Sequence, residues 1–206
     1  MEITWYGHSC FRLTERNVAT IVTDPYDASI GYALPKLKGD VVTISHTAPG
    51  HQNASAVKGA LPITGPGEYE VGGVFITGVS SSQGAAANTI YVFDYDGLTV
   101  CHLGDLADVP SQRRLEALGT IDVVLIPVGG GGGLNATKAA EVVSLLEPSL
   151  VVPMHYKTEQ NTLKLEPLAK FLKEMGLTHV SPQESLKITK DSLPEQTQVV
   201  VLEAKQ

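Results

Sequence analysis

Basic residues, cysteines and long apolar runs are all scarce in this 206-residue chain. Lys and Arg number 15 against 22 Asp and Glu, and no basic cluster is visible, which argues against a partner bound through its phosphate backbone. The apolar runs are shorter than the ~20 residues that span a bilayer. We therefore expect neither nucleic acid nor a membrane as a partner.

The two cysteines, Cys10 and Cys101, lie in apolar, strand-like contexts. Such thiols are typical of buried small side chains in a reducing compartment. The sequence opens directly into a strand pattern, Glu2–Tyr6, without a basic or signal-like segment, so we expect a cytoplasmic protein. The length and the 43% hydrophobic content suit one globular domain over residues 1–206.

Short strand patterns dominate the first half of the chain, and strand and helix alternate afterwards. Strands are predicted over Glu2–Tyr6, Cys10–Leu13, Val18–Thr23, Asp40–Ser45 and Leu61–Thr64, and over a hairpin, Asn88–Tyr95 with Leu98–His102, around Asp96-Gly97. Helices are predicted over Pro110–Leu118, Asn135–Glu147 and Lys164–Met175, and further strands over Ile121–Pro127, Leu150–Pro153 and Gln196–Val201. This order favours an α/β fold of two sheets with helices on their outer faces, a four-layer αββα sandwich.

Histidine and aspartate gather where these strands end. His46 and His51 follow the apolar run that closes at Ser45, His102 and Asp105 follow the hairpin, and His155 follows Leu150–Pro153. Imidazoles and carboxylates at strand ends are how α/β proteins build metal sites. A metal site at one edge of the sheets is therefore the first hypothesis.

Six motifs in a fixed order carry a family resemblance. They are Trp5-Tyr6-Gly7-His8-Ser9, Thr23-Asp24-Pro25, Ile44-Ser45-His46 with His51, Cys101-His102-Leu103-Gly104-Asp105, Ile126-Pro127-Val128-Gly129 and Pro153-Met154-His155-Tyr156. In this order they resemble the metallo-β-lactamase superfamily, in particular zinc-dependent hydrolases similar to ascorbate-6-phosphate lactonase. The resemblance runs from the first strand to about Thr158 and implies the αββα metallo-β-lactamase fold.

The resemblance also implies a set of metal ligands and several gaps in it. The family signature is His-x-His-x-Asp-His, followed by a middle histidine, a bridging aspartate and a late histidine. By position, His46 and His51 match the first and last members of the signature, Asp105 the bridging carboxylate and His155 the late histidine. Ala48 and Gly50 stand where the second histidine and the aspartate belong, and Gln83 is the nearest polar residue to the middle position, near Ser81–Gly84.

Most of the missing ligands belong to one of the family's two metal ions. The other metal keeps His51, Asp105 and His155, and His46 can act as a fourth ligand, so the resemblance implies one ion or none. Zinc is expected, with iron and manganese as alternatives, and His51 and Asp105 would carry the catalysis. His8, Asp24 and His102 are expected to support the ligands from behind.

Three functions fit this pattern. The first is a weakened hydrolase acting on a small ester, lactone or phosphorylated substrate through one metal ion. The second is a metal-free pseudoenzyme that serves as a binding or scaffolding module. The third, ranked below both, uses the histidines and aspartates as acid and base without a metal.

One glycine-rich segment and one apolar segment each allow a further interpretation. Gly129–Gly133 precedes a predicted helix but lacks the Lys-Ser/Thr of a nucleotide-binding loop, so it is either a flexible lid or a rim that has lost its substrate contacts, and we favour the loss. Ile30–Leu37 is apolar and could form a contact in a homo-oligomer, since the related lactonase-like branch commonly assembles.

Overall fold

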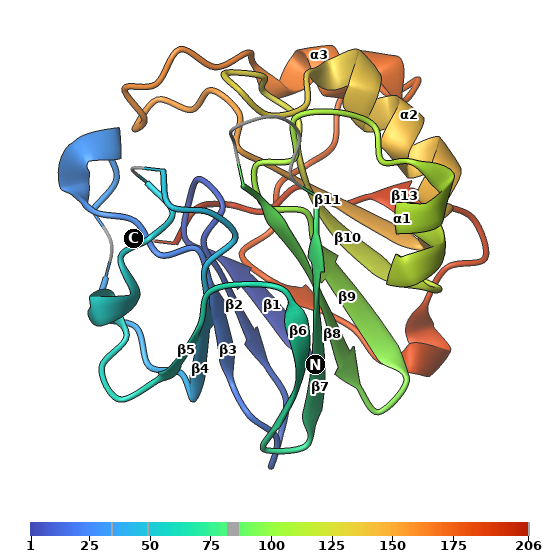
Figure 1. Ribbon diagram of the computed structural model, residues 1–206. Helices are drawn as coiled ribbons and strands as arrows, with labels where there is room; N and C mark the ends of the chain where they lie inside the picture. Colours follow the sequence, from blue (N-terminus) through green and yellow to red (C-terminus); the bar gives the residue numbers. More distant parts are fainter. Residues whose placement is uncertain (34, 49, 82–86, 206) are drawn as a thin grey trace.

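Two sheets form the body of the protein in a computed structural model that describes residues 1–33, 35–48, 50–81 and 87–205. The first sheet has the strand order β12-β1-β2-β3-β4-β5, and the second has the order β13-β11-β10-β9-β8-β7-β6. The strands of the first sheet are β1 (Glu2–Trp5), β2 (Phe11–Thr14), β3 (Ile21–Thr23), β4 (Val41–Thr43), β5 (Leu61–Ile63) and β12 (Leu186–Lys187). Those of the second are β6 (Gly67–Val71), β7 (Val74–Ser80), β8 (Thr89–Tyr95), β9 (Leu98–His102), β10 (Val123–Pro127), β11 (Leu150–Met154) and β13 (Gln198–Val199). Both sheets lie face to face (Figure 1).

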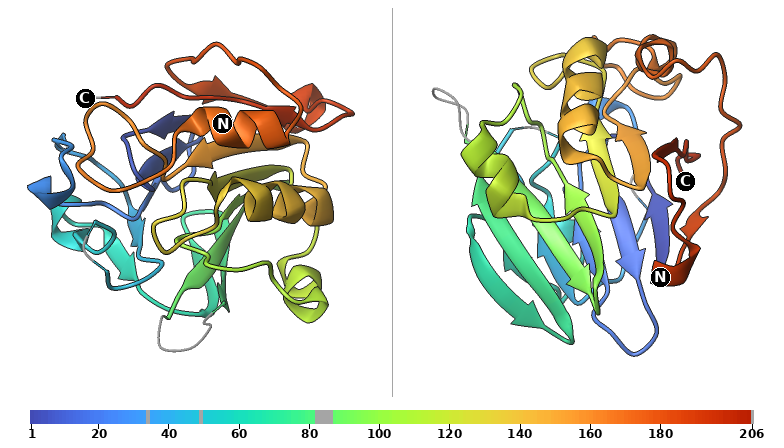
Figure 2. Two further views of the ribbon diagram at one scale, coloured as in Figure 1. Left: turned by 90° about the horizontal axis from the view of Figure 1, so that it is seen from above. Right: turned by 90° about the vertical axis from the view of Figure 1, so that its right-hand side faces the viewer.

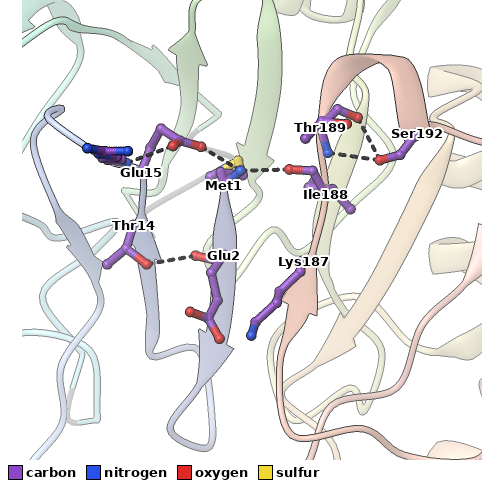
Figure 3. Close-up of a pocket in the computed structure, with 9 residues that line it drawn as sticks. Met1, Glu2, Thr14, Glu15, Lys187, Ile188, Thr189 and Ser192 are labelled. Carbon is purple, nitrogen blue, oxygen red and sulfur yellow. Dashed lines mark hydrogen bonds and ion pairs between the residues drawn. The ribbon is translucent and has the colours of Figure 1, made fainter.

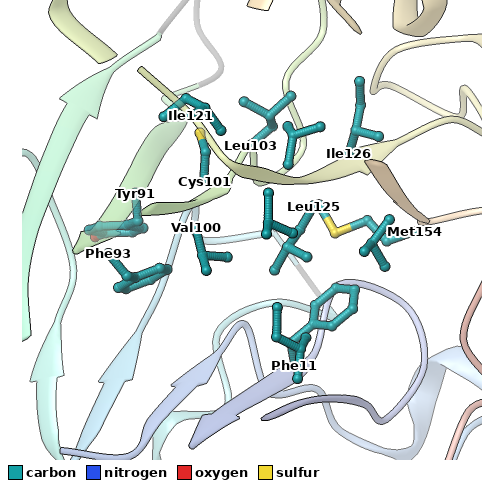
Figure 4. Close-up of a cluster of buried hydrophobic side chains, with 14 of the residues drawn as sticks. Phe11, Tyr91, Phe93, Val100, Cys101, Leu103, Ile121, Leu125, Ile126 and Met154 are labelled. Carbon is teal, nitrogen blue, oxygen red and sulfur yellow. The ribbon is translucent and has the colours of Figure 1, made fainter. Parts of the chain in front are cut away.

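The main hydrophobic core fills the space between the sheets. Side chains alternate along each strand, so Ile3, Trp5, Phe11 and Leu13 of the first sheet turn inward and are at most 2% exposed. Phe11 points from β2 toward the side chains of the second sheet, Leu125 among them (Figure 4). Burial of this apolar surface, at about 25 cal/mol per Å², is the main force that holds the two sheets together.

Helices cover the outer face of the second sheet. They are α1 (Gln112–Leu118), α2 (Ala136–Leu146) and α3 (Leu168–Glu174), and further views show them along the outer side of the same sheet (Figure 2). The amide of Asn135 caps α2 by accepting a hydrogen bond from the Lys138 backbone N–H, as the sequence predicts. In the described ranges no helix combines the length and apolar character that crossing a bilayer requires.

The outer face of the first sheet is covered by irregular chain and two short 3₁₀ turns, η1 (Ala28–Ile30) and η2 (Ala54–Ala56). A second apolar cluster forms there from Val22 and Val42 of the sheet and Tyr26, Ile30 and Tyr32 of the covering chain. Ile30, Tyr32 and Leu37 are therefore buried in their own chain, at 2%, 2% and 7% exposure. These three side chains are therefore not available for an oligomer contact, and the contact suggested for Ile30–Leu37 stays a prediction.

The sandwich predicted from the sequence is confirmed, including the Asp96-Gly97 hairpin between β8 and β9. The helix predicted over Lys164–Met175 begins only at Leu168, because Pro167 holds the residue before it out of the helical region. Cys10 and Cys101 are buried, unpaired thiols, as predicted. A third 3₁₀ turn, η3 (Lys190–Ser192), follows β12.

Candidate metal centre

Loops that follow five strands meet at one edge of the sandwich. In the first sheet β1, β3 and β4 run in the same direction, since β2 is antiparallel to both β1 and β3. In the second sheet β9, β10 and β11 are parallel to one another. The site residues follow these strands: His8 after β1, Asp24 after β3, His46 and His51 after β4, Asp105 after β9, and His155 after β11.

The four side chains predicted as metal ligands lie together at this edge. The Nε2 atom of His46 is 3.9 Å from Oδ2 of Asp105, and Nε2 of His155 is 3.8 Å from Oδ1 of the same carboxyl. The ring centres of His46 and His51 are 4.1 Å apart, and those of His51 and His155 are 5.6 Å apart. The carboxyl of Asp105 thus faces imidazoles from both sheets.

Asp24 fixes the hydrogen on His51. Its carboxylate accepts hydrogen bonds from the backbone N–H and the hydroxyl of Ser45, and its Oδ2 lies 3.0 Å from Nδ1 of His51. A carboxylate only accepts, so Nδ1 of His51 carries the hydrogen and Nε2 carries the lone pair. A carboxylate behind a histidine in this way orients the ring toward a metal.

The same reasoning fixes the hydrogen on His46. Ser45 has one hydroxyl hydrogen, which goes to Asp24, so its oxygen accepts from Nδ1 of His46 at 3.0 Å. The lone pair of His46 is therefore on Nε2, which faces the carboxyl of Asp105. Nε2 of His46 and the facing oxygen of Asp105, Oδ2, are both hydrogen-bond acceptors. At 3.9 Å they are too far apart to share a hydrogen.

Two of these acceptors are buried without a partner. Within the described residues, neither Nε2 of His46 nor Oδ1 of Asp105 finds a hydrogen-bond donor. A buried polar atom without a partner costs roughly 1–3 kcal/mol. Oδ1 lies 3.8 Å from Nε2 of His155, and Nε2 of His46 lies 3.9 Å from the other oxygen of the same carboxyl, so a cation beside this carboxyl would satisfy both unpartnered atoms. Imidazole nitrogen and carboxylate oxygen are the ligands that zinc and related divalent ions take, so these residues fit one such ion.

The pKa values of the cluster favour neutral imidazoles. Burial, helped by the neighbouring His51, lowers the pKa of His46 to about 4 and that of His155 to about 3. Burial also holds the pKa of His8 well below its usual value and raises that of Asp105, against the opposing effect of His51 and His46. Neutral imidazoles have the free lone pair that metal binding requires.

These shifts predict that the metal-free protein loses stability in mild acid. The unfolded chain protonates its histidines near pH 6.5, whereas His46 and His155 stay neutral in the fold down to about pH 4 and 3. Between those limits the unfolded state binds more protons, so the free energy of unfolding falls as the pH falls. Asp105, with a raised pKa, has the opposite effect just above pH ~4.

We expect urea denaturation in the presence of a chelator to show a slope of at least about 1.4 kcal/mol per pH unit between pH ~6 and ~5. The variant His155→Gln should reduce this slope by about 1.4 kcal/mol per pH unit, which corresponds to one proton fewer taken up on unfolding. A free energy of unfolding that stays constant over this window would contradict the buried, neutral state of the imidazoles.

Strained backbone occurs at three of the site residues. His8, Asp24 and His155 have φ of +52°, +38° and +52°, in the left-handed region that residues other than glycine rarely adopt. Such conformations cost of order 1–3 kcal/mol and persist where surrounding contacts enforce them, often at functional sites. The backbone N–H of His155 donates to the His8 carbonyl at 3.2 Å, which ties two of the three together.

His102 and Asn88 support the site through backbone contacts. The Gly104 N–H donates to Nδ1 of His102, so Nε2 carries the hydrogen and donates to the Ser9 carbonyl at 2.9 Å. His102 thus links the two sheets beneath the cluster and does not face Asp105. The side chain of Asn88 accepts from the Asp105 N–H at 3.0 Å and donates to the Leu103 carbonyl. No role at the site was predicted for Asn88 or Ser45, since neither belongs to a recognisable ligand spacing.

Comparison with known proteins identifies the family. Residues 2–155 match the beta-lactamase superfamily domain. The chain belongs to this superfamily. A crystal structure of a proposed Zn-dependent hydrolase of the metallo-β-lactamase superfamily from Thermotoga maritima is 38% identical, with a TM-score of 0.80 over 98% of this chain and 97% of that one.

A further relative agrees with this membership, and a further structure shares the fold. A UPF0173 metal-dependent hydrolase of Methanoculleus marisnigri is 28% identical over 91% of this chain and 97% of the relative. The metallo hydrolase Igni18 of Ignicoccus hospitalis shares the fold, with a TM-score of 0.68 at 22% identity over 91% of this chain and 99% of that one.

Ala48 and Gly50 stand at two positions where the resemblance implies a histidine and an aspartate, and the structure shows what surrounds them. Ala48 is exposed, and Gly50 is buried with φ +94°. A Cβ atom added at Gly50 would lie 3.0 Å from Cγ2 of Ile30 and 3.3 Å from Nε2 of His8. The space beside Gly50 is therefore occupied by the side chains of His8 and Ile30. The candidate middle position at Gln83 lies outside the described residues.

Three of the five glycines in Gly129–Gly133 are closely packed. A Cβ atom would lie 2.3 Å from the His155 carbonyl oxygen at Gly129, 2.5 Å from Leu165 at Gly131, and 2.3 Å from Oδ1 of Asp105 at Gly133. At Gly129 the close atom belongs to the backbone, whereas at Gly131 and Gly133 the side chain of Leu165 or Asp105 would have to move. Packing accounts for glycine at these three positions, and the interpretation of the loop as a rim that lost its substrate contacts stays a prediction.

A separate pocket of about 610 Å³ lies at the other edge of the first sheet, where β1 begins (Figure 3). Its lining includes Met1, Glu15, Lys187 and Thr189, and the Met1 amine makes an ion pair with Glu15. Its charges are of both signs and are paired in part within the wall. The two groups of possible metal-ligating side chains among the described residues both belong to the histidine cluster, and neither lines this cavity.

Proposed function

We propose that this protein is a metal-dependent hydrolase that works with a single divalent ion, held by His46, His51, Asp105 and His155. The observation that carries the proposal is the pair of buried, unpartnered acceptors, Nε2 of His46 and Oδ1 of Asp105, in the part of the chain that the structure describes. The names of the relatives from Thermotoga maritima and Methanoculleus marisnigri support the same activity. The gaps at Ala48 and Gly50 favour one ion over two.

When bound, such an ion polarises the scissile carbonyl or phosphoryl group and acidifies water. The protein residues have distinct tasks around it. Asp24 holds the hydrogen of His51 on Nδ1, which keeps Nε2 directed into the site. Asp105 would hold the ion through its carboxylate, whose charged form burial disfavours in the absence of a cation.

The surroundings favour a small ester or lactone over a phosphorylated substrate. Lys157, the basic residue that follows His155, directs its Nζ to the Asn161 and Leu163 carbonyls, at 2.5 and 3.5 Å. Within the described chain, the charged groups that act on the pKa values of Asp105 and His155 are histidines and an aspartate. Phosphate recognition generally relies on Lys or Arg, so a neutral carbonyl compound suits this site better.

Hydrolysis by metal-free and zinc-loaded protein tests the proposal. We expect slow turnover of an activated aryl ester and a small lactone that depends on zinc and that Asp105→Asn abolishes. An aryl phosphodiester should react more slowly than either. If none of the three substrates shows metal-dependent turnover, the metal-dependent hydrolase is the wrong function.

A metal-free binding module is the second candidate, and one observation favours it. Both ring nitrogens of His51 have protein partners, since Nε2 lies 2.8 Å from Nε2 of His8 and Nδ1 bonds Asp24. This candidate predicts an unchanged protein on addition of zinc, cobalt or manganese. The unpartnered acceptors on His46 and Asp105 remain unexplained by it, which is why it ranks second.

A further inference from the structure

His8 lies where a side chain from position 50 would enter the site. Gly50 replaces the aspartate of the superfamily signature, and a Cβ atom there would meet Nε2 and Cδ2 of His8 at 3.3 and 3.5 Å. The imidazole of His8 is only 2% exposed, so it is part of the buried cluster. It occupies the space that a carboxylate on residue 50 would need.

His8 also contacts the two histidines next to that space. Its Nε2 is 2.8 Å from Nε2 of His51, and its ring centre is 4.2 Å from that of His155. One ring nitrogen from each of these three histidines lies within 4.8 Å of the other two. This is a compact set of donor atoms from three separate loops.

The fold holds His8 in this position at a backbone cost. The residue has a left-handed backbone, and its carbonyl accepts hydrogen bonds from the Trp5 indole at 3.0 Å and from the His155 N–H at 3.2 Å. A surface histidine would have no need of such enforcement. The contacts therefore fix the ring against His51 and His155.

We propose that His8 is itself a metal ligand, in the place of the aspartate that Gly50 lacks, so that it holds the ion together with His46, His51, Asp105 and His155. This inference rests on the proposed function, because it presupposes that the protein binds an ion. In the metal-free fold Nε2 of His8 donates its hydrogen to the lone pair of His51. When the ion binds, that hydrogen moves to Nδ1 of His8, which is buried and has no partner among the described residues.

The chemistry of this set indicates which ion it takes. Four imidazoles and one carboxylate offer more nitrogen and less negative charge than the superfamily set with two carboxylates. Imidazole ligands suit zinc, iron and similar ions, whereas carboxylate-rich sites suit manganese and magnesium. We therefore expect zinc or cobalt to bind at least about 10-fold more tightly than manganese.

Cobalt titration of the metal-free full chain, followed by visible absorption, tests the ligand role of His8. His8→Ala should weaken cobalt binding by about 10-fold or more and change the absorption spectrum, since a ligand is lost. The exposed His179 provides a matched histidine control, and His179→Ala should bind as the wild type does. Unchanged affinity and an unchanged spectrum in His8→Ala would overturn the proposal.

A measurement on the wild-type protein covers the case in which His8→Ala does not fold. Nuclear magnetic resonance of ¹⁵N-histidine-labelled protein, with and without zinc, reports which ring nitrogen of His8 carries hydrogen. The proposal predicts that zinc moves the hydrogen from Nε2 to Nδ1, and an unchanged His8 in zinc-bound protein would overturn it. If zinc does not bind at all, the proposed function is wrong. If zinc binds and His8 is unchanged, only the ligand role of His8 is wrong.

Discussion

Replacing Asp105 by Asn should lower zinc affinity by at least about 100-fold, above the 10–100-fold typical of residues that only support a ligand. Asp105 is the carboxyl that faces both His46 and His155, at 3.9 and 3.8 Å. Its loss removes the negative charge that offsets the charge of the ion. Isothermal titration of metal-free protein with zinc measures the effect.

The same substitution should not weaken the metal-free fold. Burial raises the pKa of Asp105, which means that its charged form is unfavourable in the absence of a cation. We therefore expect an equal or higher Tm for metal-free Asp105→Asn. A clear loss of Tm would show that Asp105 has a structural role that this account does not include.

Asp108 provides the matched control for this experiment. It is an exposed aspartate three positions away, paired with Lys138 at 2.8 Å. Because a surface ion pair contributes little, Asp108→Asn should change neither the zinc affinity nor the Tm appreciably. Equal losses in both variants would assign the effect to charge in general rather than to the site.

Gly133→Ala should also lower both the free energy of unfolding and the zinc affinity. The added methyl group would lie 2.3 Å from Oδ1 of Asp105, so either the carboxyl or the loop must move. Overpacking of this kind costs about 1–3 kcal/mol, and displacement of Asp105 should lower zinc affinity by about 10-fold or more. Denaturation and zinc titration of the same variant measure the two effects.

Gly65→Ala is the matched control, since a Cβ atom at Gly65 meets nothing within 4 Å. The free energy of unfolding of this variant should stay within about 0.5 kcal/mol of the wild type. Wild-type zinc affinity in Gly133→Ala would show that the glycine loop does not fix the position of Asp105.

Local sequence signals were sufficient to predict most of the fold. The alternation in β1 and β2, the Asp96-Gly97 turn and the Asn135 cap each act over a few residues, so they can be recognised without tertiary information. The strand β12 was missed because Leu186–Lys187 is two residues long and is defined only by its pairing with β1. The predicted start of α3 at Lys164 is wrong because apolar spacing alone does not show that Pro167 keeps the preceding residues out of the helix.

The sequence predicted which residues lie together at the site but not how they contact one another. Motif order is sufficient to bring His46, Asp105 and His155 to one edge, because each follows a strand of known direction. The contact between His8 and His51 could not be predicted, since it depends on a left-handed backbone at His8 and on the missing side chain at Gly50. The packing of Gly133 against Asp105 likewise depends on the distance between two loops that are far apart in the sequence.

Native mass spectrometry of the full chain, stripped of metal and then supplied with zinc, tests the single-ion centre most directly. The account predicts one zinc ion per chain, retained by the wild type and lost in Asp105→Asn. A wild-type chain that stays metal-free at saturating zinc, or that takes up two ions with equal affinity, would contradict it.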